Sequence, residues 1–339
     1  MTLLRRAYVT FLVAYIAGSL SAASPVGQKS PEPPAEGLKL IWHAPPPMTA
    51  SDWYWGPGGK EQAPVSPFQF LKEDLNGTSP KVKVQDARGA TWTVKFGHEV
   101  HSDTFAPRVA YAAGYFVEPT YFVREGVIQA AHDLKRAKPF ISRTGKFQYA
   151  RFKKHDEDAL GKAEDYGWSW RGNPFAGSHE LNGLKVVMLL TSNWDGKDAT
   201  DKTSNTSVFF RKADTAYLYV FTDWGSTMGK WGGYFTRDKW DCSGYAGQTR
   251  KLVKGVKGDQ VVWGFSGKHM QDLTQGIHVD DVRWIVPYLS RFTDDQISEG
   301  LAASGASPEQ IKTFTRAVQE RIHELEQISS SPEVSSKRP

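Results

Sequence analysis

Cysteine is almost absent from this chain: Cys242 is the only one among 339 residues. A single thiol cannot close an internal disulfide, so the fold must be held together by its hydrophobic core or by bound ligands. The neighbouring residues, Trp240 to Ser243, match no catalytic motif. We therefore interpret Cys242 as a buried or merely free thiol.

The motifs of several enzyme classes are also missing. The sequence contains no Gly-x-Ser-x-Gly element, as found in serine hydrolases, and no His-Glu-x-x-His helix of zinc proteases. Lys and Arg number 42 against 37 Asp and Glu, but this excess of positive charge forms no basic run or arginine-rich helix. The composition indicates a mixed, solvated surface and predicts no nucleic-acid partner.

Long apolar runs are confined to the N-terminus. Two arginines are followed by an apolar stretch over residues 7–20 and by the small residues 21–23, which is the order found in secretory signal peptides. We predict a signal peptide over residues 1–23, cleaved near Ala23, and a secreted or periplasmic mature protein. An uncleaved anchor is the alternative, although the stretch is shorter than the ~20 residues of a membrane span. No later segment is long and apolar enough for one, so we expect no integral membrane span after cleavage.

The rest of the first half has the alternation typical of strands. Residues 24–37 are rich in proline and small residues and form a predicted linker. Strands are predicted within 80–96 and 116–123, separated by a helix over about 103–113 that places Pro107 in or near its first turn. These elements predict a small antiparallel sheet with one helix packed on it.

The second half is predicted to be mainly helical. A run that is apolar nearly all round, residues 179–191, is typical of a buried central helix. A strand hairpin follows over 208–221, and three more helices are predicted over 280–291, 294–303 and 308–327, the last two from capping motifs. A sheet-rich first half followed by a helical second half is typical of an α+β protein.

Polar residues flank the predicted buried helix and hairpin in a defined order. Asp195 follows the helix, Asn205 precedes the hairpin and Asp223 follows it. Each is a common turn residue, so only the ordered set is informative. Phosphoryl transfer uses such a set: one carboxylate positions the acceptor hydroxyl, and an amide and a second carboxylate hold a metal ion.

Together with two upstream segments, 75–81 and 94–96, this set resembles the protein-kinase-like superfamily, in its HipA, phosphatidylinositol-kinase and CotH branch. The resemblance covers residues 68–225, and the chain also resembles a group of exported bacterial proteins. It implies an α+β, bilobal protein-kinase-like fold with a small antiparallel-sheet N-lobe and a mainly helical C-lobe. The implied boundaries are 38–124 for the N-lobe, 125–327 for the C-lobe and 328–339 for a disordered tail.

The resemblance also implies which residues bind the nucleotide. They are Gly77, Ser79, Lys81 and Lys95. The first three lie in a segment that resembles a phosphate-binding loop, where backbone N–H groups and a hydroxyl contact phosphate oxygens. Lys95 resembles the strand lysine that binds the α- and β-phosphates. Glu99 is expected to hold Lys95 in place, with Asp103 as the alternative partner.

Roles in catalysis and metal binding follow from the same resemblance. The implied catalytic residues are Asp195, Lys95 and Glu99, and the implied metal ligands are Asn205 and Asp223. The implied cofactors are ATP and Mg²⁺ (or Mn²⁺), since Mg²⁺ prefers oxygen ligands that it shares with phosphates. Asn205 lies farther from Asp195 than in the family, so the loop between them is rearranged, and Asp198 or Asp201 is an alternative ligand.

The function expected from this resemblance is an exported kinase-like phosphotransferase that uses Mg–ATP. Its acceptor is a protein, a glycan or a small molecule. Nucleotidyl transfer, with ATP bound end for end, is a related alternative. The other alternative is a catalytically inactive kinase-like module, or an aromatic-rich binding module of the cell envelope, because the chain has 12 tryptophans and ATP is scarce outside the cytoplasm.

Overall fold

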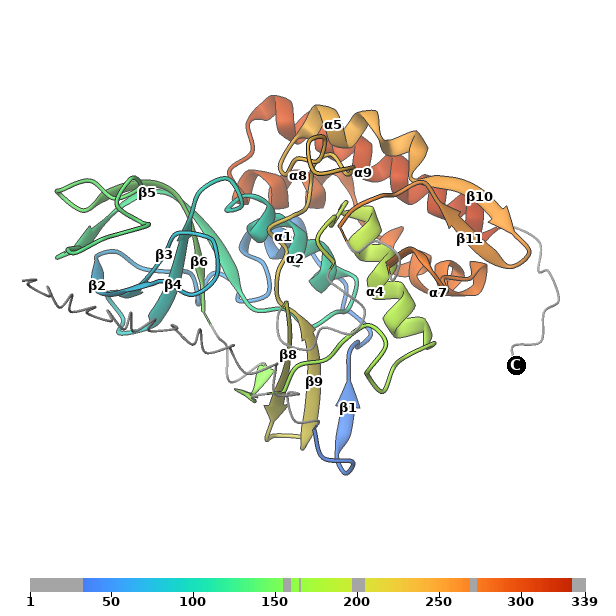
Figure 1. The fold of residues 1–339 in the computed structure, drawn as a ribbon, viewed down its shortest axis with the longest axis horizontal. Coiled ribbons are helices and arrows are strands. Elements are labelled where there is room, and N and C mark those ends of the chain that lie inside the picture. The colour runs from blue at the N-terminus through green and yellow to red at the C-terminus, as the bar shows by residue number, and fades with distance from the viewer. Residues whose placement is uncertain (1–32, 155–159, 165, 197–204, 269–272, 331–339) are drawn as a thin grey trace, which may run out of the picture.

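A computed structural model describes residues 33–154, 160–164, 166–196, 205–268 and 273–330 (Figure 1). The predicted signal peptide, the alternative ligands Asp198 and Asp201, and residues 331–339 of the predicted C-terminal tail lie outside these residues. No helix within these ranges is both long and apolar enough to cross a membrane.

The first part of the molecule is a closed barrel, at the left of Figure 1. Its strands are β2 (Phe68–Asp74), β3 (Lys81–Gln85), β4 (Thr91–Phe96), β5 (Thr120–Gln129) and β6 (Lys146–Lys153). They pair in the order β2-β3-β4-β6-β5, and a parallel pairing of β2 with β5 closes the barrel. Apolar residues such as Val82, Val94 and Phe152 fill the interior, and side chains alternate between the two faces of each strand.

This barrel differs from the predicted small antiparallel sheet in two ways. One strand pairing is parallel, and β6 lies beyond the boundary predicted at residue 124. A strongly twisted sheet buries its apolar face more completely when it closes on itself. β6 escaped prediction because two adjacent apolar residues, Tyr149 and Ala150, interrupt the alternation of polar and apolar residues along the strand.

Helix α2 (Ser102–Ala112) lies between the barrel and the remaining helices (Figure 1). It confirms the predicted helix and is buried along almost its whole length. The helix begins at Ser102, so Pro107 lies in its second turn, next to the first turn in or near which it was predicted. The proline has no N–H to donate to the carbonyl of Asp103, so the helix loses one internal hydrogen bond there.

The second part combines a small sheet with a group of helices. The sheet has the strand order β1-β9-β8-β7. The elements are β1 (Leu38–Leu40), α1 (Ala50–Trp55), β7 (Lys162–Ala163), α4 (His179–Leu190), β8 (Thr206–Arg211), β9 (Ala216–Phe221), α5 (Cys242–Gly247), β10 (Val253–Lys257), β11 (Gln260–Trp263), α7 (Val279–Leu289), α8 (Asp294–Ala303) and α9 (Pro308–Ser329). The segregation of a barrel from a largely helical part confirms the predicted α+β class.

The predicted helices and hairpin of this part are present. α4 is buried from Leu181 to Leu190, and β8 and β9 form an antiparallel hairpin. α8 and α9 begin at the expected capping boxes, with Thr293 and Ser307 as their N-caps. Local sequence signals therefore set the ends of these elements.

Arg321 on α9 ties that helix to the end of α4. Its side chain is fully buried and donates hydrogen bonds to the Leu190 carbonyl (2.9 Å), the Ser192 hydroxyl (2.7 Å) and the Tyr245 carbonyl (2.8 Å). The carbonyls in the last turn of a helix have no partner within it, so this arginine satisfies one of them. The bond lies just before the segment that carries Asp195.

Replacing Arg321 with lysine should lower the free energy of unfolding by about 3 kcal/mol, because an ammonium group cannot reach all three acceptors and a buried charge loses its partners. The matched control is Arg316→Lys on the same helix, where the side chain is 66% exposed. We expect a change within about 0.5 kcal/mol for the control. Urea unfolding measures both, and equal stability of the two variants would contradict the proposed tie between α9 and α4.

Candidate active site

A cleft of about 950 Å³ runs between the barrel and the open end of the β8–β9 hairpin. Small-molecule sites commonly measure about 300–1,000 Å³. The site residues predicted from the sequence all line this one cleft: Gly77, Ser79, Lys81, Lys95, Glu99, Asp195, Asn205 and Asp223. Residues that are far apart in the sequence thus meet in a single cavity.

Hairpin geometry brings Asn205 and Asp223 together. The first residue of β8, Thr206, lies opposite the last residue of β9, Phe221. Beyond this pair, the Thr222 N–H donates a hydrogen bond to the Asn205 carbonyl (2.8 Å). Asn205 has a φ of 64°, a left-handed conformation that asparagine tolerates better than most residues. The residues that flank the open end of the hairpin therefore face the cleft together.

The segment after α4 lies alongside the chain at Asp223. The Trp194 N–H donates to the Ser226 carbonyl (3.1 Å), and the Asn193 side-chain amide donates to the Asp223 carbonyl (3.4 Å). The Asn193 side-chain oxygen in turn accepts a hydrogen bond from the Asp195 N–H (3.2 Å). One hydrogen-bonded unit therefore positions both aspartates.

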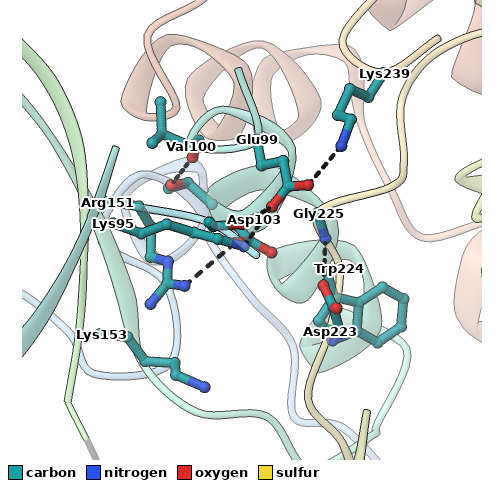
Figure 2. A network of polar contacts seen from close by, with 12 residues as sticks. Lys95, Glu99, Val100, Asp103, Arg151, Lys153, Asp223, Trp224, Gly225 and Lys239 are labelled. Carbon is teal, nitrogen blue, oxygen red and sulfur yellow. Dashed lines mark hydrogen bonds and ion pairs between the residues drawn. The ribbon is translucent and has the colours of Figure 1, made fainter. Parts of the chain in front are cut away.

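Lys95 is the centre of a buried ionic network (Figure 2). Its Nζ lies 2.6 Å from Glu99 and 2.7 Å from Asp103. Arg151 contacts the same oxygen of Asp103 at 3.2 Å, and Lys239 contacts the second oxygen of Glu99 at 2.5 Å. The expected contact between Lys95 and Glu99 is present, and Asp103, the alternative partner, is bound at the same time. The two residues are four positions apart, and the Asp103 N–H donates to the Glu99 carbonyl (2.8 Å), which places both carboxylates within reach of the lysine.

The ionic network keeps its carboxylates charged. Burial raises the pKa of Glu99, but Lys95 and Lys239 outweigh burial and hold that pKa at about 2. Burial likewise raises the pKa of Asp103, and Lys95 and Arg151 bring it to about 2. Burial lowers the pKa of Lys95, whereas Asp103 and Glu99 raise it, and the net direction is upward. The lysine is therefore a fixed positive charge at the cleft wall.

Asp223 differs from these two carboxylates because no salt bridge joins it to a cation among the described residues. One of its oxygens accepts a hydrogen bond from the Gly225 N–H at 3.1 Å (Figure 2). Burial and the neighbouring Asp103 raise the pKa of Asp223, and Lys95 only partly offsets them. A bound cation would stabilise the charged form of a carboxylate in this environment.

The donor set beside Asp223 fits a hard divalent cation. Asp223 and Asn205 both line the cleft. Mg²⁺ takes one or two protein oxygens and completes an octahedral shell with water and substrate phosphates. Within the described ranges, no three His, Cys, Asp or Glu side chains are grouped as a metal site. Asp223 and Asn205 are the residues that could hold such a cation here.

Asp195 is accessible from the cleft. Its side chain is 31% exposed, and the Lys268 Nζ lies 3.7 Å from its Oδ1. The backbone N–H of Lys268 donates to the Trp194 carbonyl (2.8 Å), which holds the two segments side by side. Asp195 can thus contact a molecule bound in the cleft, and Lys268, which the sequence did not predict, adds a positive charge at the same place.

The predicted phosphate loop forms one wall of the cleft. Gly77 has a φ of +64°, a conformation that favours glycine. The Ser79 hydroxyl donates to Glu99 (3.0 Å), and Lys81 lies 3.6 Å from Asp74. The loop is therefore tied to the ionic network through Glu99.

The contribution of β6 to the cleft was missed. Arg151 and Lys153 both line it, and Lys153 pairs with Glu118 at 2.5 Å. A signal was present in the sequence: residues 151–153 alternate polar, apolar and polar, as do 81–83 and 93–95. The same alternation on three paired strands places their polar side chains on one face.

No protein-family model matches the chain, and no curated protein matches it. Solved structures that are similar at low identity include the following three. A Helicobacter pylori proinflammatory kinase, CtkA, has a TM-score of 0.43 and 11% identity, over 78% of this chain and 96% of the kinase. A Golgi casein kinase with Mn/ADP bound has a TM-score of 0.38 and 12% identity, over 79% of this chain and 74% of that one. A second structure of the Golgi casein kinase has a TM-score of 0.37 and 10% identity, over 80% and 76%.

Proposed function

We propose that the chain is a kinase-like phosphotransferase that uses ATP with Mg²⁺ or Mn²⁺. The observation that carries the proposal is the convergence, in one cleft, of a buried lysine held by carboxylates with two further aspartates on separate segments. In this proposal the barrel is the N-lobe and the helical part is the C-lobe of a bilobal kinase-like fold. The barrel side supplies positive charge for the donor, and the opposite side supplies the carboxylates.

The residues divide between binding and transfer. Lys95 contacts the phosphates of the donor, and Glu99 and Asp103 hold its ammonium group in place. Asp223 and Asn205 hold the metal ion, which when bound neutralises charge on the phosphates. Gly77, with its adjacent backbone N–H groups, contacts phosphate oxygens from the loop.

The transfer step then needs one further group, Asp195. Its carboxylate holds the acceptor hydroxyl and takes up the proton as the acceptor oxygen attacks the terminal phosphorus. The bond between that phosphorus and the bridging oxygen breaks, and its electron pair leaves with the nucleoside diphosphate. Positioning and charge neutralisation supply most of the catalysis, because the transferring group needs little covalent help.

We also propose that the protein acts outside the cytoplasm, on a protein, a glycan or a small molecule. The order of charged, apolar and small residues at the N-terminus supports export. An inactive binding module is the alternative, and Tyr234 and Phe235 favour it because they are 76% and 94% exposed. Exposed aromatic side chains are common at binding surfaces.

Asp195→Asn should bind ATP as the wild type does but lose about 10²–10⁴-fold in transfer, because the amide cannot accept the proton. Calorimetry with Mg²⁺ gives the dissociation constant, and transfer of labelled γ-phosphate to the protein itself or to mixed acceptor proteins gives the rate. The control is Asp238→Asn, an exposed aspartate near Trp194, which should leave both quantities unchanged. A wild type that binds no nucleotide would favour the binding module.

A further inference from the structure

Among the described residues, those that line the cleft include none with an apolar side chain. Within the part of the chain that the structure describes, every residue that lines it is charged, polar or glycine. A purine base has flat apolar faces, and protein sites usually enclose such groups with hydrophobic and aromatic side chains. A neighbouring cavity has Phe221 and Trp224 in its walls, but at about 10 Å³ it holds about one water molecule. The described residues of the cleft can therefore form many hydrogen bonds and ion pairs with phosphates, but few apolar contacts with a base.

The face of the barrel that lines the cleft is cationic. Lys81 on β3 lies directly opposite Lys95 on β4, and Lys95 lies opposite Arg151 on β6. In the next row, Thr93 lies opposite Lys153. Like charges placed directly opposite one another destabilise a sheet. Carboxylates offset part of this repulsion, and an anionic ligand would offset more of it.

Arg151 has buried donors without a partner. Its side chain is 7% exposed, and its Nη2 contacts Asp103. Its Nε and Nη1, like the Thr120 hydroxyl, are buried and have no hydrogen-bond partner among the described residues. Unsatisfied buried N–H groups are costly, and a guanidinium fork matches two oxygens of a phosphate. Arg151 and Lys153 line both the small cavity and the cleft, so both residues border the space that a molecule in the cleft would occupy.

We propose that Arg151 and Lys153 bind a phosphate group at this end of the cleft, so that the donor is recognised through its chain of phosphates and not through its base. The ligand class is a polyphosphate: a nucleoside triphosphate with any base, or inorganic polyphosphate. This inference rests on the proposed function, because it takes the cleft to be the donor site. It goes further by naming what the site selects.

The test compares ATP, GTP and inorganic tripolyphosphate by calorimetry on the wild-type protein with Mn²⁺. Recognition through phosphates predicts dissociation constants that agree within about threefold, which is less than 1 kcal/mol. Adenosine at millimolar concentration should not compete. A site that encloses the base would instead bind ATP far more tightly than tripolyphosphate.

Lys153→Gln should weaken the binding of all three probes by about tenfold, which is the effect of losing one charge-assisted hydrogen bond. The matched control is Lys83→Gln. Lys83 lies opposite Thr93, which lies opposite Lys153, so it belongs to the same cross-strand row, but it does not line the cleft. Its replacement removes the same charge from the same row and should leave binding unchanged.

Arg151→Lys keeps the positive charge but removes the paired N–H donors of the guanidinium group. It should therefore weaken the binding of tripolyphosphate more than Lys153→Gln does. If this variant fails to fold, the comparison of Lys153→Gln with Lys83→Gln still decides. Equal effects of those two variants on binding would overturn the inference.

The outcomes separate the inference from the proposed function. ATP binding without tripolyphosphate binding, or competition by adenosine, overturns recognition through phosphates and leaves the proposed function intact. Failure of all three probes overturns both. When the three affinities agree, transfer of label from terminally labelled tripolyphosphate identifies inorganic polyphosphate as a donor, and transfer from ATP alone identifies nucleotides. Both results support the inference.

Discussion

Asp223→Asn should weaken metal-dependent binding of ATP by at least about 100-fold, because even residues that only support a metal ligand typically contribute 10–100-fold. The variant should nevertheless be as stable as the wild type or more stable. Burial and Asp103 raise the pKa of Asp223. A carboxyl whose pKa is raised on folding destabilises the folded state at neutral pH, and this cost disappears as the pH falls and the group is protonated. Lost binding without lost stability would mark a ligand-binding carboxylate.

Thermal unfolding measures both effects in one experiment. Wild-type Tm should rise when Mn²⁺ and ATP are added, since a ligand that binds only the folded state stabilises it. Asp223→Asn should begin at an equal or higher Tm and show no rise. The control is Asp214→Asn at the turn of the β8–β9 hairpin, an exposed carboxylate paired with Arg211 at 2.7 Å, which should keep the full rise. If the Tm of Asp223→Asn rises as much as that of the wild type, the metal ion binds elsewhere.

Lys95→Met should abolish transfer and lower the free energy of unfolding by about 3–5 kcal/mol. The side chain is 9% exposed and neutralises Glu99 and Asp103. Removing one partner from a buried ionic network leaves uncompensated charge, which is far more costly than losing an exposed pair. Arg151 still contacts Asp103 in the variant, so part of the stabilisation should remain.

The stability difference should depend on pH. In the wild type, Glu99 and Asp103 have pKa values of about 2, below their usual values. Groups with a lowered pKa in the folded state stabilise the protein above their unfolded pKa, and this contribution is lost as the pH falls toward 2. Without Lys95 both pKa values rise, so the gap between wild type and Lys95→Met should narrow between about pH 5 and pH 2.

Urea unfolding at pH 7 and across this acidic range measures the gap. The control is Lys83→Met on β3, which removes a lysine from the same barrel without touching the cleft, and it should change stability by about 0.5 kcal/mol or less. A gap between wild type and Lys95→Met that stays constant with pH would mean that lost packing, and not lost ion pairing, explains the variant.

The sequence predicted elements whose periodicity or end signals are local. The nearly all-round apolar pattern of α4 and the capping boxes at Thr293 and Ser307 require no knowledge of the rest of the fold. The barrel could not be predicted from local signals. The parallel pairing of β2 with β5 and the position of β6 between β4 and β5 depend on contacts between segments distant in the sequence. Strand order could not be derived from alternation alone.

The candidate site shows the same contrast between residues marked by local signals and residues placed by contacts between distant segments. Asp195, Asn205 and Asp223 could be identified because each lies at the end of a predictable helix or hairpin. Arg151 and Lys153 were missed, because the alternation around them indicates only a strand, and their position next to Lys95 becomes visible only when β6 is placed beside β4. The dual pairing of Lys95 likewise depends on where α2 begins, because that start places Glu99 before the helix and Asp103 within it.

Crystals of the wild-type protein grown with Mn²⁺ and ATP would test the central claim most directly, through anomalous scattering from manganese. The proposed site predicts a manganese peak within about 2.5 Å of an Asp223 carboxylate oxygen, with phosphate density between it and Lys95. No manganese peak in this cleft while the nucleotide is bound elsewhere, or a peak held by residues outside the cleft, would contradict the account.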